Sequence, residues 1–161
     1  MKRDEHSFEE DIKKLLESQQ IEVYTQVIPE ECKYWEYPYQ VDIIFYYFGE
    51  YYGFELKHIS TFGQGGVIAK AFLQLEKYKN LTYFTNQKIK QWGIGLNVES
   101  ENTNPECSPT TQIFVQTFFN FLGYNYLRYK EYSYNRKVIT INPTTKDRKE
   151  IKNFKWVNNG I

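Results

Sequence analysis

Cysteine is scarce in this 161-residue chain, which has only Cys32 and Cys107. Two thiols cannot supply the four ligands of a structural zinc or iron–sulfur centre. The sequence also lacks a signal-peptide pattern and any apolar run long enough to cross a membrane. These absences predict a cytoplasmic protein of a reducing compartment, with free thiols and no membrane partner.

Net charge is absent as well, because 20 basic residues balance 20 acidic residues. The distribution is nevertheless uneven. Residues 1–60 hold 6 Lys or Arg and 13 Asp or Glu, a balance of −7, whereas residues 123–161 hold 9 and 3, a balance of +6. An acidic front that suits a metal and a basic tail that suits phosphate are one interpretation. Mutual attraction of the two ends within the fold is the other.

Repeats, heptads and low-complexity segments are missing, and the glycine-rich residues 58–66 lack the Gly-Lys-Ser/Thr ending of a phosphate loop. Hydrophobic residues make up 41% of the chain and aromatic residues 19%, which predicts an ordered core. At this length we expect one domain spanning residues 1–161.

The most informative stretch is residues 41–59, where two apolar, aromatic runs flank Gly49 and Glu50. This composition predicts two β-strands joined by a tight turn. If Gly49 and Glu50 form a two-residue loop, Asp42 lies opposite Lys57.

Glu55 then lies opposite Ile44, two residues along each strand from that pair. Residues that are opposite or two apart share a face of the sheet, so Asp42, Glu55 and Lys57 converge on one side. The two carboxylates at that range suit a hard cation such as Mg²⁺, and the lysine lies beside it. The alternative is a solvent-facing hairpin with an Asp42–Lys57 ion pair.

The order Asp42, twelve residues, Glu55-x-Lys57 resembles the PD-(D/E)XK nuclease superfamily, which includes RecB-type nucleases, archaeal Holliday junction resolvases and many restriction enzymes. Val41 stands where the superfamily name has proline. The resemblance implies an α/β fold with a restriction-endonuclease-like core, a central mixed β-sheet flanked by helices. It also implies a Mg²⁺- or Mn²⁺-dependent hydrolase of DNA phosphodiester bonds, acting as endonuclease or exonuclease, with RNA as an alternative substrate.

By the same resemblance, the metal ligands are Asp42, Glu55 and the carbonyl of Leu56. Lys57 would orient or help to deprotonate the attacking water and screen the scissile phosphate.

A first helix is predicted from Ser7, because Ser7 and Glu10 fit a capping box. Its buried stripe consists of Phe8, Ile12, Leu15 and Leu16. Glu9 and Asp11 flank this stripe. The resemblance assigns Glu9, with Asp11 as second choice, to a catalytic role beside the metal. A solvated charge near the helix N-terminus is the alternative.

Residues 67–79 predict another helix, in which Gln74 and Tyr78 share a face. Gln-x-x-x-Tyr resembles the third motif of RecB-type nucleases. This resemblance implies that Gln74 helps to hold the active site and that Tyr78 supports it or binds nucleic acid. The alternative is an exposed Gln74 and a packed Tyr78.

The basic tail interleaves tyrosines with cations, and we expect Arg128 and Lys130 to bind nucleic acid. An edge strand with one aromatic and one charged face is the alternative. The remaining elements are predicted as follows: strands at 21–28, 81–85, 92–98 and 154–157, a loop at 99–109, a helix at 110–122 and a charged turn at 144–150.

Two further functions stay open at this point. A structure-selective, resolvase-like endonuclease would require a homodimer to cut two strands. A non-catalytic nucleic-acid-binding protein on the same fold would use these charges only structurally.

Overall fold

The computed structural model describes residues 5–59, 65–81, 83–98 and 109–155. The helices are α1 (Glu5–Ser18), α2 (Gly65–Leu81) and α3 (Pro109–Phe121), with a short 3-10 helix, η1, at Glu30–Cys32. The strands are β1 (Val23–Val27), β2 (Val41–Tyr47), β3 (Glu50–Ile59), β4 (Tyr83–Phe84), β5 (Gln87–Lys88), β6 (Gln91–Val98), β7 (Asn125–Tyr132), β8 (Arg136–Ile141) and β9 (Lys149–Lys152).

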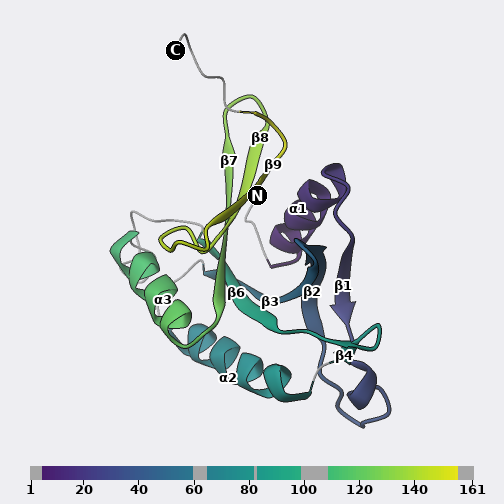
Figure 1. Ribbon diagram of the computed structural model, residues 1–161. Helices are drawn as coiled ribbons and strands as arrows, with labels where there is room; N and C mark the ends of the chain where they lie inside the picture. Colours follow the sequence, from purple (N-terminus) through teal and green to yellow (C-terminus); the bar gives the residue numbers. More distant parts are fainter. Residues whose placement is uncertain (1–4, 60–64, 82, 99–108, 156–161) are drawn as a thin grey trace.

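Seven strands form one sheet in the order β1-β2-β3-β6-β7-β8-β9, and β4 pairs with β5 separately. The central strands β3, β6 and β7 run parallel, whereas the outer pairs are antiparallel. Helices α2 and α3 connect the parallel strands and lie on one side of the sheet, while α1 lies on the other (Figure 1). The expected α/β fold, a central mixed sheet flanked by helices, is therefore confirmed.

Each face of the sheet has its own apolar core. The α1 side buries the predicted stripe of that helix against strand residues such as Phe45, Phe54, Leu56 and Ile139. The α2 and α3 side buries Ile44, Leu75, Trp92, Phe119 and Tyr126, among others. Alternation along the strands sends successive side chains into the two cores.

Close approach of neighbouring groups explains why β6 contains glycine. A Cβ added at Gly93 would collide with the carbonyl oxygen of Asn125 and the ring of Phe54. The sheet also curls around α1, so that the Tyr47 hydroxyl of β2 donates a hydrogen bond to the carbonyl of Glu150 in β9, at 3.5 Å. Within the described ranges, no helix has the length and apolar content needed to cross a membrane.

Several predicted boundaries are wrong. Helix α1 begins at Glu5, so Ser7 lies inside the helix and is not its N-cap. Within the described residues the last strand is β9, which occupies part of the predicted charged turn. The predicted strand at 81–85 is reduced to the two residues of β4, because α2 continues to Leu81. Most of the predicted 58–66 and 99–109 loops, and the end of the predicted 154–157 strand, lie outside the described residues.

Candidate metal-binding site

The β2–β3 hairpin has a different turn from the one predicted. Phe48 and Gly49 form the two-residue loop, and both have positive φ, at 50° and 78°. Two positive φ angles define a type I′ turn, whose twist matches that of the strands. Tyr47 therefore faces Glu50.

The new register shifts β3 by two residues against β2, since Ile43 faces Phe54. Continued by one pair, it sets Asp42 opposite Glu55, and the predicted opposition of Asp42 and Lys57 is wrong. Because side chains alternate between the two faces of a sheet, a register shift of two residues leaves each side chain on the same face. Asp42, Glu55 and Lys57 thus lie on one side of the sheet, the side covered by α2 and α3.

Asp42 lies where β2 and β3 separate. Its Oδ2 accepts a hydrogen bond from the backbone N–H of Leu56 at 2.8 Å. The side chain thus takes the place of a strand partner for this N–H. In an extended strand, the N–H and C=O of one residue point to the same neighbour. The Leu56 carbonyl therefore points toward the same side as Asp42.

Glu55 is buried at the centre of this group, with 1% of its surface exposed. Burial raises the pKa of its carboxyl to about 9, with a further contribution from the negative charge of Asp42, and the Lys57 ammonium opposes the shift. Its Oε1 is buried and accepts no hydrogen bond. A buried acceptor left without a partner costs stability, so its retention requires a reason.

Lys57 lies two residues beyond Glu55 on the same face. Its Nζ is 4.0 Å from Oε2 of Glu55, and its side chain is partly exposed. This separation is at the limit of an ion pair, so the ammonium is near enough to act on the site without neutralising Glu55 through a tight contact.

Glu9 of α1 approaches the same place from the other side of the sheet edge. It is 7% exposed, and the side-chain amide of Gln26 donates to both of its carboxylate oxygens, at 3.0 and 3.1 Å. Burial raises the pKa of Glu9, the bond from Gln26 lowers it, and the charge of Asp42 raises it. The carboxylates of Asp42 and Glu9 are therefore close enough to repel each other electrostatically. Asp11, the second choice for this role, is half-buried.

Gln26 and Gln40 were not among the predicted site residues. Gln26, the residue before the last of β1, has a positive φ of 52°, and its amide reaches Glu9. Its carbonyl accepts a bond from the Gln40 amide at 3.4 Å, and the Gln40 carbonyl accepts one from the Tyr78 hydroxyl at 3.2 Å. The position of Gln40 two residues before Asp42 was the only signal available in the sequence.

Tyr78 supports this frame from α2. Its ring is 3% exposed and packs on Tyr39 and Trp92, with both centroid distances at 5.6 Å. Burial first, and then the charge of Glu55, raise the pKa of its hydroxyl. Its packed position agrees with a supporting role and leaves no ring face for stacking on a base.

Gln74 lies one turn before Tyr78 on the same face of α2 and is half-buried. Its Oε1 is buried without a hydrogen-bond partner, like Oε1 of Glu55. Both orphaned atoms are acceptors, and acceptors require a donor or a cation.

Arg128 and Lys130 of β7 lie on the same side of the sheet as Glu55. Glu55 is aligned with Ile94 of β6, which is aligned with Tyr126 of β7. Arg128 follows Tyr126 by two residues and therefore shares its face. Arg128 is half-buried with an unpartnered Nε, and Lys130 is exposed.

The donor set fits a hard cation with a small number of protein ligands. In the described part of the chain, no group of three or more His, Cys, Asp or Glu side chains lies close enough to hold a metal. Asp42, Glu55 and the Leu56 carbonyl form a set of two carboxylates and one carbonyl instead. Mg²⁺ commonly takes one or two carboxylates and keeps several waters. The unpartnered Oε1 of Glu55 is the atom that such an ion would satisfy.

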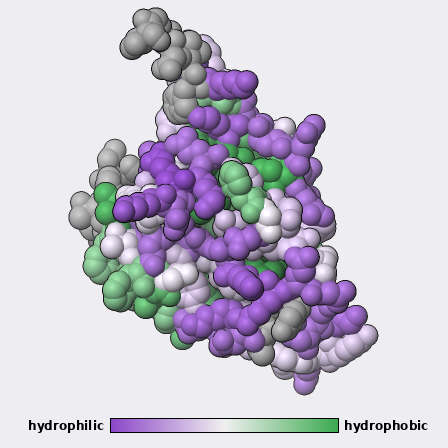
Figure 2. Space-filling view, in the orientation of Figure 1, coloured by the Kyte–Doolittle hydropathy of each residue, from purple (hydrophilic) through white to green (hydrophobic). Residues whose placement is uncertain are grey.

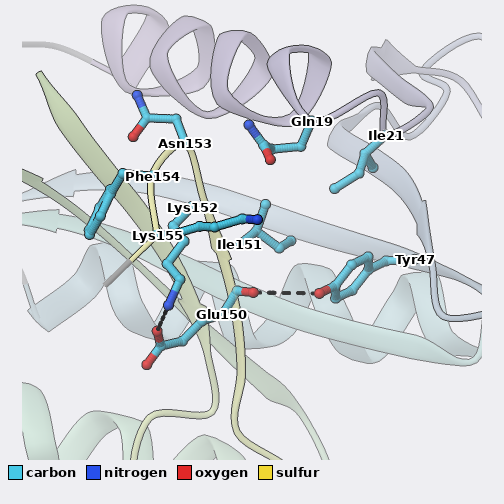
Figure 3. Close-up of a pocket in the computed structure, with 9 residues that line it drawn as sticks. All are labelled: Gln19, Ile21, Tyr47, Glu150, Ile151, Lys152, Asn153, Phe154 and Lys155. Atoms are coloured by element: carbon cyan, nitrogen blue, oxygen red, sulfur yellow. Dashed lines mark hydrogen bonds and ion pairs between the residues drawn. The ribbon is translucent and has the colours of Figure 1, made fainter. Parts of the chain in front are cut away.

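A hollow lies between the end of α1, β2 and β9, away from Asp42 and Glu55 (Figure 3). Its volume is about 480 Å³, and it is lined by Gln19, Tyr47 and Lys152, among others. The carboxylate in its wall, Glu150, is 3.6 Å from Lys152 and 2.7 Å from Arg148. Tyr47 and Asp42 stand at opposite ends of β2. This hollow is therefore separate from the acidic cluster.

Comparisons with known proteins leave the function open. No protein family matches the chain, and no curated protein matches it significantly. Among solved structures, it is similar to a protein of unknown function, AF1548, with 19% identity and a TM-score of 0.43. That match covers 75% of this chain and 56% of the other.

Proposed function

We propose that the protein is a Mg²⁺- or Mn²⁺-dependent nuclease that hydrolyses DNA phosphodiester bonds. The observation that carries this proposal is the buried Glu55 carboxyl, with an unpartnered oxygen, beside Asp42 and within 4.0 Å of Lys57. The Asp-x(12)-Glu-x-Lys spacing, similar to that of the PD-(D/E)XK superfamily, supports the same reaction.

Asp42, Glu55 and the Leu56 carbonyl would hold the ion. When bound, such an ion supplies Lewis acidity, which acidifies a water and offsets the charge that develops on the phosphate. The Leu56 N–H orients the Asp42 carboxylate through the bond to Oδ2. Residues that orient a ligand in this way are as necessary as the ligand itself.

Lys57 would orient the attacking water by donating a hydrogen bond to it, because its ammonium lies beside Glu55 and is partly exposed. Its positive charge also favours the phosphate in the transition state. Glu9, held by Gln26, would steady the site from the side of α1. Gln74 would add its unpartnered oxygen from α2.

Nucleic acid would reach the site along the β7 side of the sheet. Arg128 and Lys130 follow the row of Glu55 on the same face, and the unpartnered Nε of Arg128 is a donor that a phosphate oxygen would satisfy. The β7–β8 hairpin projects beyond the rest of the sheet, as Figure 1 shows, and carries exposed Tyr132, Tyr134 and Arg136. Aromatic rings and cations on one projecting ribbon suit stacked bases and phosphates.

Cleavage of plasmid and single-stranded DNA in Mg²⁺ and in Mn²⁺ tests the proposal. Glu55→Gln preserves the shape of the side chain and should lower the cleavage rate by roughly 100- to 1,000-fold. Glu50→Gln changes an exposed carboxylate at the other end of the same strand and should leave the rate unchanged. Equal rates for the wild type and Glu55→Gln in both metals would overturn the catalytic assignment.

A protein that binds nucleic acid without cutting it is the second candidate, favoured by the basic β7–β8 hairpin. It predicts that fluorescence anisotropy detects DNA binding while the wild type cleaves nothing. A structure-selective, resolvase-like enzyme predicts instead that four-way junctions are cleaved well and linear duplexes poorly. Arg128→Ala and Lys130→Ala should each weaken binding and reduce its salt dependence.

A further inference from the structure

Helix α3 leaves a broad apolar face uncovered. Phe114 and Phe121 are 69% and 87% exposed, and four more large apolar side chains near them are exposed as well. These six residues, which we call the α3 patch, are Leu73, Ile113, Phe114, Phe118, Phe121 and Leu122. Figure 2 shows apolar side chains gathered over α3 and the adjoining part of α2.

A groove between α2 and α3 continues the patch inward. It has a volume of about 380 Å³ and is lined only by apolar residues, including Ala69, Phe72, Phe114 and Phe118. The rings of Phe72 and Phe118 lie 6.4 Å apart within it. Leu73 follows Ala69 by one helical turn, so it borders the same groove. The surface is therefore a raised row of rings beside a slot that could accept such rings.

Charge is absent from α3, since residues 109–121 contain no Asp, Glu, Lys or Arg. An uncharged face gives a nucleic acid nothing to bind electrostatically. It also allows the same face of a second chain to approach without repulsion of like charges. In a two-fold interface the same patch occurs on both partners, so a self-complementary surface of rings and slot is what it requires.

The exposed area is also sufficient. At roughly 200 Å² for a large side chain in full contact with solvent, the α3 patch exposes roughly 700 Å² per chain. Patches at or above this size are unusual on monomers and mark interaction sites. Two copies would bury roughly 1,400 Å² from these side chains alone, which lies in the range of specific interfaces.

We propose that the protein forms a two-fold symmetric homodimer in which the α3 patches of two copies pack against each other. Phe121 or Phe114 of each copy would enter the groove between α2 and α3 of the other. The inference rests on the patch and not on the nuclease proposal, so either stands if the other fails.

Sedimentation velocity or light scattering after size exclusion measures the mass directly. The wild type should have twice the 19.4 kDa mass of one chain at micromolar concentrations. Phe121→Glu and Phe114→Glu place like charges across the interface and should weaken the dimer by at least about 100-fold, giving a single-chain mass. Tyr37→Glu is the matched control, because Tyr37 is 82% exposed in a loop outside the patch, and it should remain dimeric.

Circular dichroism and thermal melting establish that each variant is folded, and two independent variants guard against the failure of one. If the wild type still has the mass of one chain at 100 micromolar, the inference is overturned, and an apolar ligand site would be the better explanation of the groove. A dimer that survives both Phe variants overturns it equally, since the interface would lie elsewhere.

Discussion

The two faces of β3 have opposite compositions although their residues alternate along one strand. Phe54 and Leu56 enter the core beneath α1, where they pack among apolar side chains. Glu55 and Lys57 enter the side covered by α2, where Glu55 is as deeply buried as the apolar residues beside it. Equal burial therefore has opposite consequences, because a buried side chain stabilises the fold when it is apolar and destabilises it when it is an unpaired carboxylate.

The comparison indicates that the α1 face stabilises the fold through apolar packing, whereas the other face retains polar groups at a cost in stability. The α1 face has three stacked rings, with Phe45 lying 5.5 Å from Tyr52 and 5.7 Å from Phe54. The other face keeps Asp42, Glu55 and an orphaned oxygen at the point where β2 and β3 separate. Substitutions on the two faces should therefore differ in sign as well as in size.

The largest effect is expected on the α1 face. Phe54→Ala removes a fully buried ring and should lower the free energy of unfolding by about 3–5 kcal/mol, through lost burial and the cavity left behind. Chemical denaturation measures this loss. Tyr37→Ala, at an exposed ring, should change stability by less than about 0.5 kcal/mol. Similar losses for the two variants would mean that the stacked rings contribute little.

Metal binding should act only through the opposite face. At a Mn²⁺ concentration 100 times its dissociation constant, the wild type should gain about 2.7 kcal/mol, or roughly 5–10 °C in Tm. Glu55→Gln removes a ligand and should abolish most of this gain, whereas Glu50→Gln should retain it. Thermal melts with and without Mn²⁺ decide the matter, and a full gain in Glu55→Gln would place the ion elsewhere.

The pH dependence of the metal-free protein should also separate the faces. The pKa of Glu55 is about 9 in the fold, against 4.5 for an ordinary glutamate. Between these values the folded state holds a proton that the unfolded chain has released. The contribution of Glu55 to stability should therefore be greatest below about pH 5 and fall as pH rises toward 9, by at most about 1.4 kcal/mol per pH unit.

Glu55→Gln tests this slope, because its amide stays neutral and can donate to Asp42 as a protonated Glu55 would. In EDTA at pH 8 the variant should be more stable than the wild type by at least about 2 kcal/mol and at most about 5 kcal/mol, with little difference at pH 4. Denaturation curves at the two pH values measure this difference. A wild type and a Glu55→Gln variant whose stabilities change equally between pH 5 and 9 would contradict the raised pKa of the buried Glu55 carboxyl.

The smallest effect is expected at the edge of the site. Gln26→Ala removes both bonds to the buried Glu9 carboxylate and should cost about 1 kcal/mol. Gln20→Ala is a close control, since Gln20 is exposed and also has a positive φ, of 60° against 52° for Gln26. Equal costs in denaturation would assign the effect to the backbone and not to Glu9.

Much of this arrangement follows from local patterns. The apolar spacing of α1 predicted four side chains that the structure buries, Phe8, Ile12, Leu15 and Leu16. The helices at 67–79 and 110–122 and the strand at 92–98 are confirmed within a few residues. These predictions succeed because a helix or strand is amphipathic over a few turns and needs no distant partner for its pattern.

Other features required distant contacts. The turn at Phe48 and Gly49 has positive φ at a phenylalanine, which its sequence does not favour, so the predicted loop was displaced by one residue. The bond between Tyr47 and Glu150 joins residues 103 positions apart and arises from the curl of the sheet. Gln26, which has a positive φ, donates hydrogen bonds to Glu9, which lies 17 positions away in the chain.

The amino-acid order predicted that Asp42, Glu55 and Lys57 would share a side for any two-residue turn. Side chains alternate with a period of two, so a turn displaced by one residue moves the register by two and leaves that side unchanged. Only the tertiary structure decided how deeply each side chain is buried and with which residues it forms hydrogen bonds. Helix α2 packs over Glu55, and its Tyr78 hydroxyl donates a hydrogen bond to the Gln40 carbonyl. The Gln26 amide of β1 donates a hydrogen bond to Glu9 of α1. Burial and hydrogen-bond partners depend on elements remote in the chain, which a local period does not encode.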